Sequence, residues 1–414
     1  MKYFVSAFST LYLIVLLSFV PPAKLPQGYW RAVLERSDGE QIVFNFETKL
    51  IKGKQIMYVM NGAERMLVDS FEFENDSVFF QMPFFESGFR AVIGSDGNLS
   101  GTWVKQFANR TQYMPFKAYY NVKERFASKS KPAYNVSGRW SVLFHRENDR
   151  STPAIGEFVQ KGNYLTGSFL TPSGDYRYLQ GVVSGDTMIL SGFDGGFAQL
   201  FRAKIESDNK LVDGRYISGP RANIGWQAVR DPNASLPDEY DQTHMKLGES
   251  KLTFSFPGLD GNNISESDKR FQDKVLIVQI FGSWCPNCMD ETKFLTEIYN
   301  RYQSKGLEIV GLAYERTTEA ERSFTALKKY QQRFNVQYPI LWTGVAVGDS
   351  LRTEKTLPQL DNIKVFPTTI IINRKGEVVK IHTGFSGPGT GVHHENYKKE
   401  FTEMLEGLLN KKAG

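Results

Sequence analysis

The sequence contains two cysteines, Cys285 and Cys288, separated by two residues. Two thiols at this spacing can form a disulfide and be reduced again, or they can supply two ligands of a metal ion. Because there are no other cysteines, the chain has no set of structural disulfides, and cysteine alone cannot complete a four-ligand zinc site. The pair is therefore expected to be a redox couple or half of a mixed Cys/His metal site.

The peptide around the cysteines favours redox chemistry. It joins an apolar segment to a predicted helix, so Cys285 would lie at the helix N-terminus, where free N–H groups and the helix dipole stabilise a thiolate. Pro286 suits the first helical position. Cys288 would lie one turn further on, within reach of a mixed disulfide on Cys285. We expect Cys285 to be the nucleophile and Cys288 the resolving thiol.

Two adjacent histidines, His393 and His394, form the main competing constellation. Together with the cysteines they could bind copper or zinc. They follow a glycine-rich segment, residues 384–391, just before the last predicted helix. Adjacent histidines in such a place are more often surface or capping residues, so metal binding is the alternative interpretation and redox chemistry the first.

Strands and helices that alternate after residue 246 must position the cysteines. The apolar run 275–281 predicts a buried central strand. Helices are expected over 286–305, ended by Gly306, over 318–335 with Thr318 as its N-cap, and over 395–410; further strands are expected over 307–313, 368–373 and 378–381. This order, ending in a hairpin and a helix, predicts an α/β layer with a mixed sheet.

The region from residue 27 to residue 230 has a different pattern. Short apolar or aromatic runs are separated by Gly, Asn and Asp, and no long stretch has helical periodicity. We find no catalytic constellation in this region. Asp76, Asp186 and His145 are scattered and are expected to mark turns or surface.

Three motifs recur in this region in the same order, which predicts the duplication of one β-unit. The matching positions are Trp30 and Trp140, Asp76 and Asp186, and Gly101 and Gly214. The repeats would cover about 27–125 and 135–230, each with about five short strands. Two such units could close into a barrel or stack as a sandwich, since both arrangements remove exposed strand edges.

The N-terminus carries an export signal in this interpretation. An apolar run from Tyr3 to Val20 follows Met1-Lys2 and ends at two prolines. Residues 1–23 are expected to be a signal peptide or membrane anchor, and an uncleaved segment would tether the chain through residues 3–20. The protein is then expected in the periplasm or on the outer face of the cytoplasmic membrane.

The whole chain is therefore expected to be multidomain. An N-terminal duplicated all-β barrel or sandwich (27–230) precedes a linker (231–245) and a C-terminal α/β domain with a mixed sheet (246–414). The net charge of +5 arises from 50 basic and 45 acidic residues. That balance gives no case for nucleic-acid binding.

The segment from about residue 246 to residue 412 resembles the TlpA/ResA-like branch of the thioredoxin-fold disulfide oxidoreductases. Trp284-Cys-Pro-Asn-Cys288 matches the W-C-x-x-C motif of the family, and Glu291 matches the acid of its extended C-x-x-E pattern. Val365-Phe366-Pro367-Thr-Thr369 matches the loop whose proline is cis in this fold.

The resemblance implies a role for each matching residue. Glu291 would accept a proton or modulate a thiol pKa. This role becomes more important because Gln279 occupies the position at which thioredoxins proper carry a buried Asp. Trp284 would shield the site. Pro367 would face the cysteines and leave a strand edge open there, so that Phe366 could pair its backbone with an extended substrate.

These features predict an exported thiol–disulfide oxidoreductase that reduces disulfides of envelope proteins. Its partners would be protein thiols or disulfides and an upstream membrane or envelope electron donor, and it would need no cofactor beyond the Cys285–Cys288 disulfide. The direction of electron flow is implied by the resemblance alone. The alternative is a β-domain binding module, whose aromatic side chains could line a ligand cavity, with a thioredoxin-fold passenger or a Cys/His copper chaperone.

Overall fold

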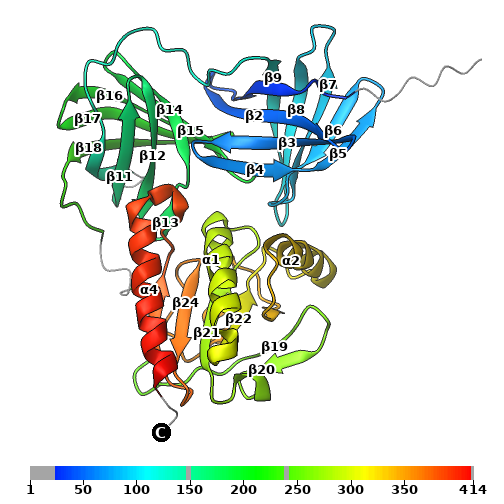
Figure 1. The fold of residues 1–414 in the computed structure, drawn as a ribbon, viewed down its shortest axis with the longest axis vertical. Helices are drawn as coiled ribbons and strands as arrows, with labels where there is room; N and C mark the ends of the chain where they lie inside the picture. The colour runs from blue at the N-terminus through cyan, green and yellow to red at the C-terminus, as the bar shows by residue number, and fades with distance from the viewer. Residues whose placement is uncertain (1–23, 146–150, 237–241, 412–414) are drawn as a thin grey trace, which may run out of the picture.

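The computed structural model describes residues 24–145, 151–236 and 242–411. Two β-domains lie side by side above one α/β domain (Figure 1). The predicted export segment lies outside the described residues. None of the helices formed by the described residues is both long enough and apolar enough to span a bilayer.

The first β-domain is one curved antiparallel sheet, which we call the first barrel. Its strands are β1 (Gly28–Glu35), β2 (Gln41–Ile51), β3 (Lys54–Asn61), β4 (Glu64–Val68), β5 (Ser70–Glu74), β6 (Ser77–Gln81), β7 (Ser87–Ile93), β8 (Leu99–Gln106) and β9 (Thr111–Tyr120). Consecutive strands pair except β4 and β5, and β1 also pairs with β9. Side chains alternate inward and outward, as Phe89 (buried) and Arg90 (exposed) do in β7.

The second β-domain, the second barrel, repeats this arrangement. Its strands are β10 (Gly138–His145), β11 (Ser151–Lys161), β12 (Tyr164–Thr171), β13 (Gly174–Asp175), β14 (Leu179–Ser184), β15 (Thr187–Phe193), β16 (Ala198–Ser207), β17 (Lys210–Ser218) and β18 (Ala222–Arg230). Here β10 pairs with both β11 and β18, and an additional β11–β12 pairing closes the ring.

Each barrel therefore has nine strands, although in the second barrel β12 rather than β13 pairs with β14. The expectation of about five strands per repeat is wrong. Tight hairpins explain the difference. Lys52 and Gly53, which join β2 to β3, have φ values of 51° and 77°. A two-residue turn of this kind leaves no long polar gap between two strands, so two strands read as one run in the sequence.

The aromatic side chains of this region fill the interiors of the barrels. In the first barrel Phe80 and Phe89 stack with ring centroids 4.7 Å apart, and in the second Phe169 and Phe201 stack at 4.4 Å. Trp30 and Trp140, which the repeat equates, are both fully buried. These aromatics form two separate cores rather than the lining of an empty barrel.

The α/β domain has a five-stranded mixed sheet in the order β23-β22-β21-β24-β25. Its elements are β19 (Ser255–Pro257), β20 (Asn263–Ser265), β21 (Val275–Phe281), α1 (Pro286–Tyr302), β22 (Leu307–Ala313), α2 (Ala320–Phe334), β23 (Ile340–Trp342), α3 (Arg352–Thr356), β24 (Thr368–Ile372), β25 (Val378–Thr383) and α4 (Val392–Asn410). The strands β21, β22 and β23 are parallel, and β24 and β25 are antiparallel to their neighbours. The predicted thioredoxin-like layer with a mixed sheet is confirmed.

Two helix starts differ from the sequence prediction. Helix α2 begins at Ala320 with Glu319 as its N-cap residue, so the assignment of Thr318 as the N-cap is wrong. Glu319 already has extended backbone dihedrals, and its N–H bonds to the hydroxyl of Thr317, which holds the preceding residues in a turn. Helix α4 begins at Val392, so the two histidines lie in its first turn rather than before it.

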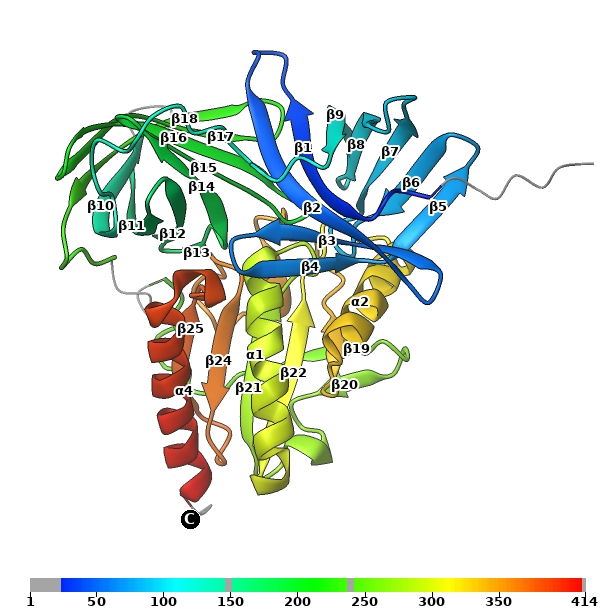
Figure 2. The same cartoon turned by 45° about the horizontal axis from the view of Figure 1, so that its top comes forward.

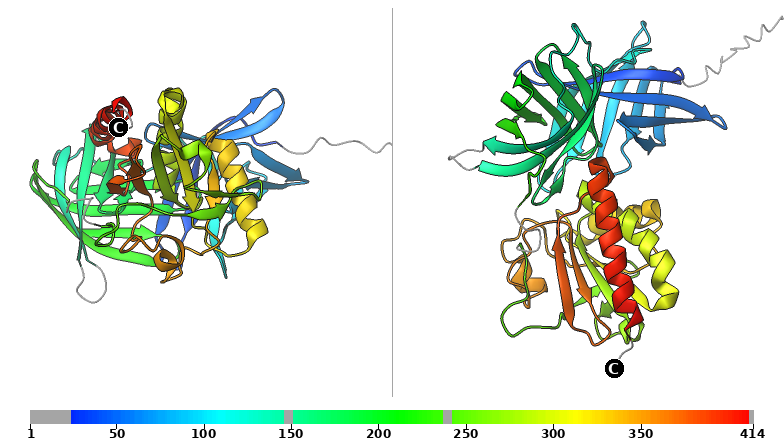
Figure 3. Two further views of the ribbon diagram at one scale, coloured as in Figure 1. Left: turned by 90° about the horizontal axis from the view of Figure 1, so that it is seen from below. Right: turned by 60° about the vertical axis from the view of Figure 1, so that its left-hand side comes forward.

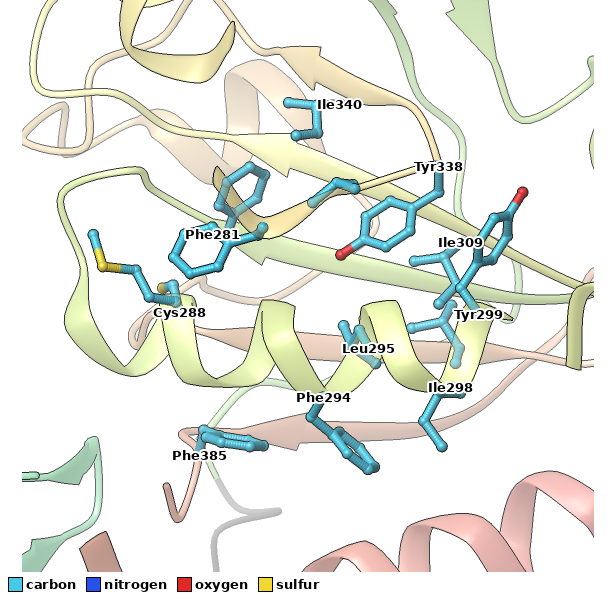
Figure 4. Close-up of a cluster of buried hydrophobic side chains, with 14 of the residues drawn as sticks. Phe281, Cys288, Phe294, Leu295, Ile298, Tyr299, Ile309, Tyr338, Ile340 and Phe385 are labelled. Atoms are coloured by element: carbon cyan, nitrogen blue, oxygen red, sulfur yellow. The ribbon is translucent and has the colours of Figure 1, made fainter. Parts of the chain in front are cut away.

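Helices α1, α2 and α4 cover one face of the mixed sheet. Figure 4 shows Phe294, Leu295 and Ile298 of α1 packed in the buried cluster between helix and sheet. Cys288 belongs to the same cluster. Helix α1 is therefore held in place by apolar contacts on both sides of Cys288.

The barrels pack on the end of the α/β domain where α1 and α4 begin (Figures 2 and 3). From the first barrel, Phe84 stacks on Phe334 of α2 with ring centroids 5.2 Å apart, and Glu86 forms an ion pair with Arg322. From the second barrel, Glu157 bonds to His393 of α4 at 2.9 Å. Both barrels therefore contact the domain that carries the cysteines.

Candidate active site

Cys285 is the N-cap residue of α1, and its sulfur takes part in the cap. The backbone N–H of Cys288 donates to Cys285 Sγ at 3.3 Å, and Pro286 occupies the first helical position. A negative charge on this sulfur would face the free N–H groups and the positive end of the helix dipole. The side chain is only 5% exposed. This is the arrangement that the sequence predicts for the nucleophile.

Cys288 is completely buried one turn further along α1. Burial raises the pKa of its thiol well above the ordinary value, and the neighbouring Cys285 and Glu291 add to the effect. A thiol in this position stays protonated until a base removes its proton. It is shielded from solvent oxidants and reagents, and Cys285 is its nearest electrophilic partner once a mixed disulfide has formed there.

Glu291 lies on the buried face of α1 and not in solvent. Its carboxylate accepts hydrogen bonds from Gln279 Nε2 at 2.8 Å and from the Thr369 hydroxyl at 2.7 Å. Gln279 and Thr369 are directly opposite one another on the paired strands β21 and β24, so one sheet face presents both donors. Burial raises the pKa of Glu291 to about 7, although the two hydrogen bonds oppose the shift.

A second group of hydroxyls ties this carboxylate site to the cysteine turn. The Thr292 hydroxyl lies 2.8 Å from that of Tyr330, and Tyr330 donates to the backbone carbonyl of Cys288 at 3.1 Å. Gln279 Nε2 also donates to Thr292 at 3.0 Å. Helix α2, which carries Tyr330, therefore holds the first turn of α1 in place through side-chain hydrogen bonds.

Trp284, Phe366 and Pro367 surround the sulfur of Cys285. The Phe366–Pro367 bond is cis, and the Cys285 thiol donates to the Phe366 carbonyl at 3.5 Å. The rings of Trp284 and Phe366 are 5.6 Å apart, and the indole N–H of Trp284 donates to the Tyr314 carbonyl at 2.8 Å. The structure thus brings all six predicted site residues together around one helix N-terminus.

The histidines do not join the cysteines. His393 bonds to Glu157 of the second barrel, and His394 Nδ1 lies 2.9 Å from the Ser386 carbonyl. Within residues 24–145, 151–236 and 242–411 there is no group of three or more His, Cys, Asp or Glu side chains that could hold a metal ion. The alternative Cys/His metal site therefore finds no support in the geometry of these residues.

The β-domains contribute contacts at the site that the sequence gave no reason to expect. Phe85 of the first barrel belongs to the same buried cluster as both cysteines. In the second barrel a Cβ on Gly174 would come within 2.4 Å of the side-chain amide of Asn287, so the hairpin rests directly on the Cys-Pro-Asn-Cys turn. The loop that carries Phe85 has no sequence motif that predicts this contact. Its backbone is unusual, since Phe85 has a positive φ of 70°.

An ion-pair cluster joins all three domains beside the cysteine turn. Arg177 of the second barrel bonds to Glu64 of the first barrel at 2.5 Å and to Asp290 of α1 at 3.3 Å. Its guanidinium also donates to the Pro286 carbonyl at 3.4 Å. Although burial alone would favour the neutral form, these acids raise the pKa of Arg177. Removal of Arg177 would therefore take away the cation that Glu64 and Asp290 share.

Two hollows flank Cys285. A groove of about 1120 Å³ lies between the first barrel and α2, and its lining includes Ser283, Trp284 and Arg316. A smaller cavity of about 390 Å³ lies between the second barrel and the residues Pro286, Asn287 and Val365. The β-domains thus cover the cysteine turn and leave an opening on each side of it.

Comparison with known proteins agrees with this site. Residues 246–400 match the Redoxin family model. The thiol-disulfide oxidoreductase ResA of Halalkalibacterium halodurans is 27% identical over 168 residues, which are 40% of this chain and 81% of the relative. ResA of Bacillus subtilis is 26% identical over 137 residues, 33% of this chain and 67% of the relative.

Solved structures show the same partial coverage. A thiol-disulfide oxidoreductase from Bacteroides fragilis has 16% identity and a TM-score of 0.28, over 36% of this chain and 99% of the other. A thiol:disulfide interchange protein from Chlorobium tepidum has 21% identity and a TM-score of 0.30, over 39% of this chain and 96% of the other. The family-model match over residues 246–400 and the ResA relatives confirm the predicted resemblance of the C-terminal domain.

The buried carboxyl group makes stability depend on pH. The pKa of Glu291 is about 7 in the folded chain against 4.5 for a free glutamate, so its contribution to the free energy of unfolding is fully present below pH 4.5 and is lost as the pH rises through 7. Its loss amounts to about 3 kcal/mol. Urea unfolding of Glu291→Gln should show a smaller decline in stability between pH 4.5 and 8 than the unchanged chain. The exposed Glu297→Gln on the same helix is the control, and an equal decline in all three proteins would contradict the assignment.

Proposed function

We propose that this chain is an exported thiol–disulfide oxidoreductase that reduces disulfides of envelope proteins through Cys285 and Cys288. The observation that carries the proposal is the position of the Cys285 sulfur. It caps helix α1 and lies 3.5 Å from the carbonyl of Phe366, beside the cis proline. The ResA relatives, which are thiol-disulfide oxidoreductases, support the same chemistry.

In the first step the Cys285 thiolate attacks one sulfur of a substrate disulfide. A bond forms between Cys285 and that sulfur, the substrate S–S bond breaks, and the second substrate sulfur leaves as a thiolate. Negative charge on the Cys285 sulfur faces the N-terminus of α1, where N–H groups and the helix dipole attract it. Trp284 and Phe366 exclude water from one side of the reacting sulfur, which strengthens the electrostatic interactions there.

In the second step Cys288 resolves the mixed disulfide. Its thiol must lose a proton, and Glu291 lies near enough to raise its pKa by charge repulsion. With a pKa of about 7, Glu291 is close to the operating pH of a general base. The Cys288 sulfur then bonds to Cys285 and the substrate leaves as a thiolate. The substrate gains two electrons, and the chain now holds a Cys285–Cys288 disulfide.

A donor outside the chain must return the two electrons. The Cys285–Cys288 disulfide is reduced by the same thiol–disulfide exchange, in which a thiolate of the donor now attacks it. The donor is therefore a dithiol, and it lies in the membrane or envelope with the exported chain. The apolar run from Tyr3 to Val20 supports export, with a tether to the membrane if it is not cleaved. Outside the cytoplasm disulfides persist, so a reductase has substrates there.

The two cysteines should fail in different ways. Cys285→Ser should reduce insulin no faster than the buffer does, because no nucleophile starts the exchange. Cys288→Ser should form a stable mixed disulfide with the substrate, because no thiol resolves it. Insulin turbidity and non-reducing gel electrophoresis measure the two outcomes. Insulin reduction that survives Cys285→Ser would refute the proposal.

Replacement of the buried acid should slow the resolving step. In Glu291→Gln, release of substrate from the mixed disulfide should fall about 100-fold at neutral pH, and the dependence of that rate on a group of pKa near 7 should disappear. Rapid-quench measurement from pH 5 to 9 separates this step from the first attack. Glu297→Gln is the matched control. An unchanged pH profile in Glu291→Gln would exclude a role in proton transfer.

The reduction potential tests the direction of electron flow. A reductase should have a Cys285–Cys288 potential more negative than about −200 mV, whereas a value near −120 mV is typical of a strong oxidant. Equilibration with glutathione or dithiothreitol buffers, followed by thiol alkylation, measures it. A value near the oxidising end would leave the exchange chemistry intact and overturn the assignment as a reductase.

A further inference from the structure

The groove between the first barrel and α2 is built from both domains. The loop between β6 and β7 supplies Phe84, Phe85 and Glu86 on one side, and α2 supplies the other. Trp284, the residue before the nucleophile, also lines it. Neither Phe366 nor Pro367 does. The groove is therefore separate from the strand edge at the cis proline: that edge contacts the Cys285 sulfur through the Phe366 carbonyl, whereas the groove reaches Ser283 and Trp284, the two residues before Cys285.

The length of the groove suits a polypeptide better than a small molecule. Its lining on α2 runs from Glu319 to Arg333, a rise of about 21 Å at 1.5 Å per residue. An extended chain covers that distance with about six residues at 3.3 Å each. The volume of about 1120 Å³ is also at or above the upper end of the range for small-ligand pockets.

Arg316 offers this groove hydrogen-bond donors. Its guanidinium lies over two rings, 5.4 Å from the Trp284 centroid and 5.1 Å from that of Phe107 in the first barrel. Among the residues that the structure describes, none forms a hydrogen bond or close ion pair with Arg316. The N–H groups of a guanidinium above a ring face lie in the guanidinium's own plane and point sideways. A peptide carbonyl can therefore accept hydrogen bonds from them.

Phe85 limits how a substrate can approach. It is 6% exposed and belongs to the buried cluster that contains both cysteines, so the first barrel packs into the core that holds the nucleophile. A rigid protein surface cannot lie flat on a cysteine that is 5% exposed. A single extended strand is narrower than a protein surface and fits a groove, where Phe84 and Trp284 provide apolar contacts for its side chains.

We propose that this groove binds an extended polypeptide segment of about six residues next to the substrate cysteine. The first barrel is then part of the substrate site. This proposal rests on the function proposed above and adds to it the form in which the substrate is accepted: a locally unfolded segment rather than the surface of a folded domain. Arg316 holds the backbone of the segment, and Phe84 and Trp284 contact its side chains.

The test uses the reduced full-length chain and a series of mixed disulfides with 5-thio-2-nitrobenzoate. The probes are cysteine alone, a tripeptide, a linear hexapeptide with cysteine at one end, and the same hexapeptide closed head to tail. Stopped-flow absorbance follows release of the thionitrobenzoate. The linear hexapeptide should react about tenfold faster than cysteine or the cyclic peptide, with the tripeptide in between, because contacts remote from the sulfur lower the barrier to attack.

Variants of the groove separate binding from damage to the fold. In Arg316→Gln and in Phe84→Ala, the ratio of the hexapeptide rate to the cysteine rate should fall about fivefold. A change that only disturbs the redox site moves both rates together and leaves the ratio as it is. Arg221→Gln is the matched control, because Arg221 is exposed on the turn between β17 and β18 of the second barrel.

The possible results are distinct. A rate that rises with peptide length and a ratio that falls in both groove variants support the proposal. Equal rates for cysteine, linear hexapeptide and cyclic hexapeptide would overturn it and leave the thiol–disulfide exchange function standing. No reaction with any probe would refute the proposed function itself.

Discussion

The hydrogen bond from the Cys288 backbone to the Cys285 sulfur is the contact on which the rest of the site depends. It makes the nucleophile part of the helix cap, so the charge of the thiolate and the unpaired N–H groups of α1 satisfy one another. The cap holds only if the first turn of the helix stays in place. Tyr330 secures that turn from α2, and Arg177 secures it from the second barrel.

The placement of Glu291 shows how the same helix supplies acid–base chemistry. Its carboxylate faces the sheet, where Gln279 and Thr369 bond to both of its oxygens. An amide at position 279 cannot release a proton, but it can orient a neighbouring carboxylate by donating to it. Thioredoxins proper carry an acid at the position of Gln279. In this chain the proton-carrying group of the site is therefore Glu291 on the helix rather than an acid on the strand.

The α/β domain and its site were largely predictable because local sequence patterns determine them. The run Val275–Phe281 is an unbroken apolar strand, and the Cys-Pro-Asn-Cys peptide carries its own helix start. The place of Phe85 in the buried cluster of the cysteines and the contact of Gly174 with Asn287 were not predictable. They depend on how three domains pack, and neither periodicity nor turn propensity encodes a contact between residues more than 100 positions apart. The number of strands was missed for a related reason, since tight hairpins hide strand boundaries.

The pairing of first and last strands in each barrel sets the order in which the chain can be assembled. A barrel cannot close until its final strand has been made, so β1 waits for β9 and β10 waits for β18. All strands of both barrels precede the cysteines in the chain, and domains generally fold as units. Barrels that fold first offer Cys285 and Cys288 a surface to dock on, which shortens the time for which two reactive thiols stay exposed.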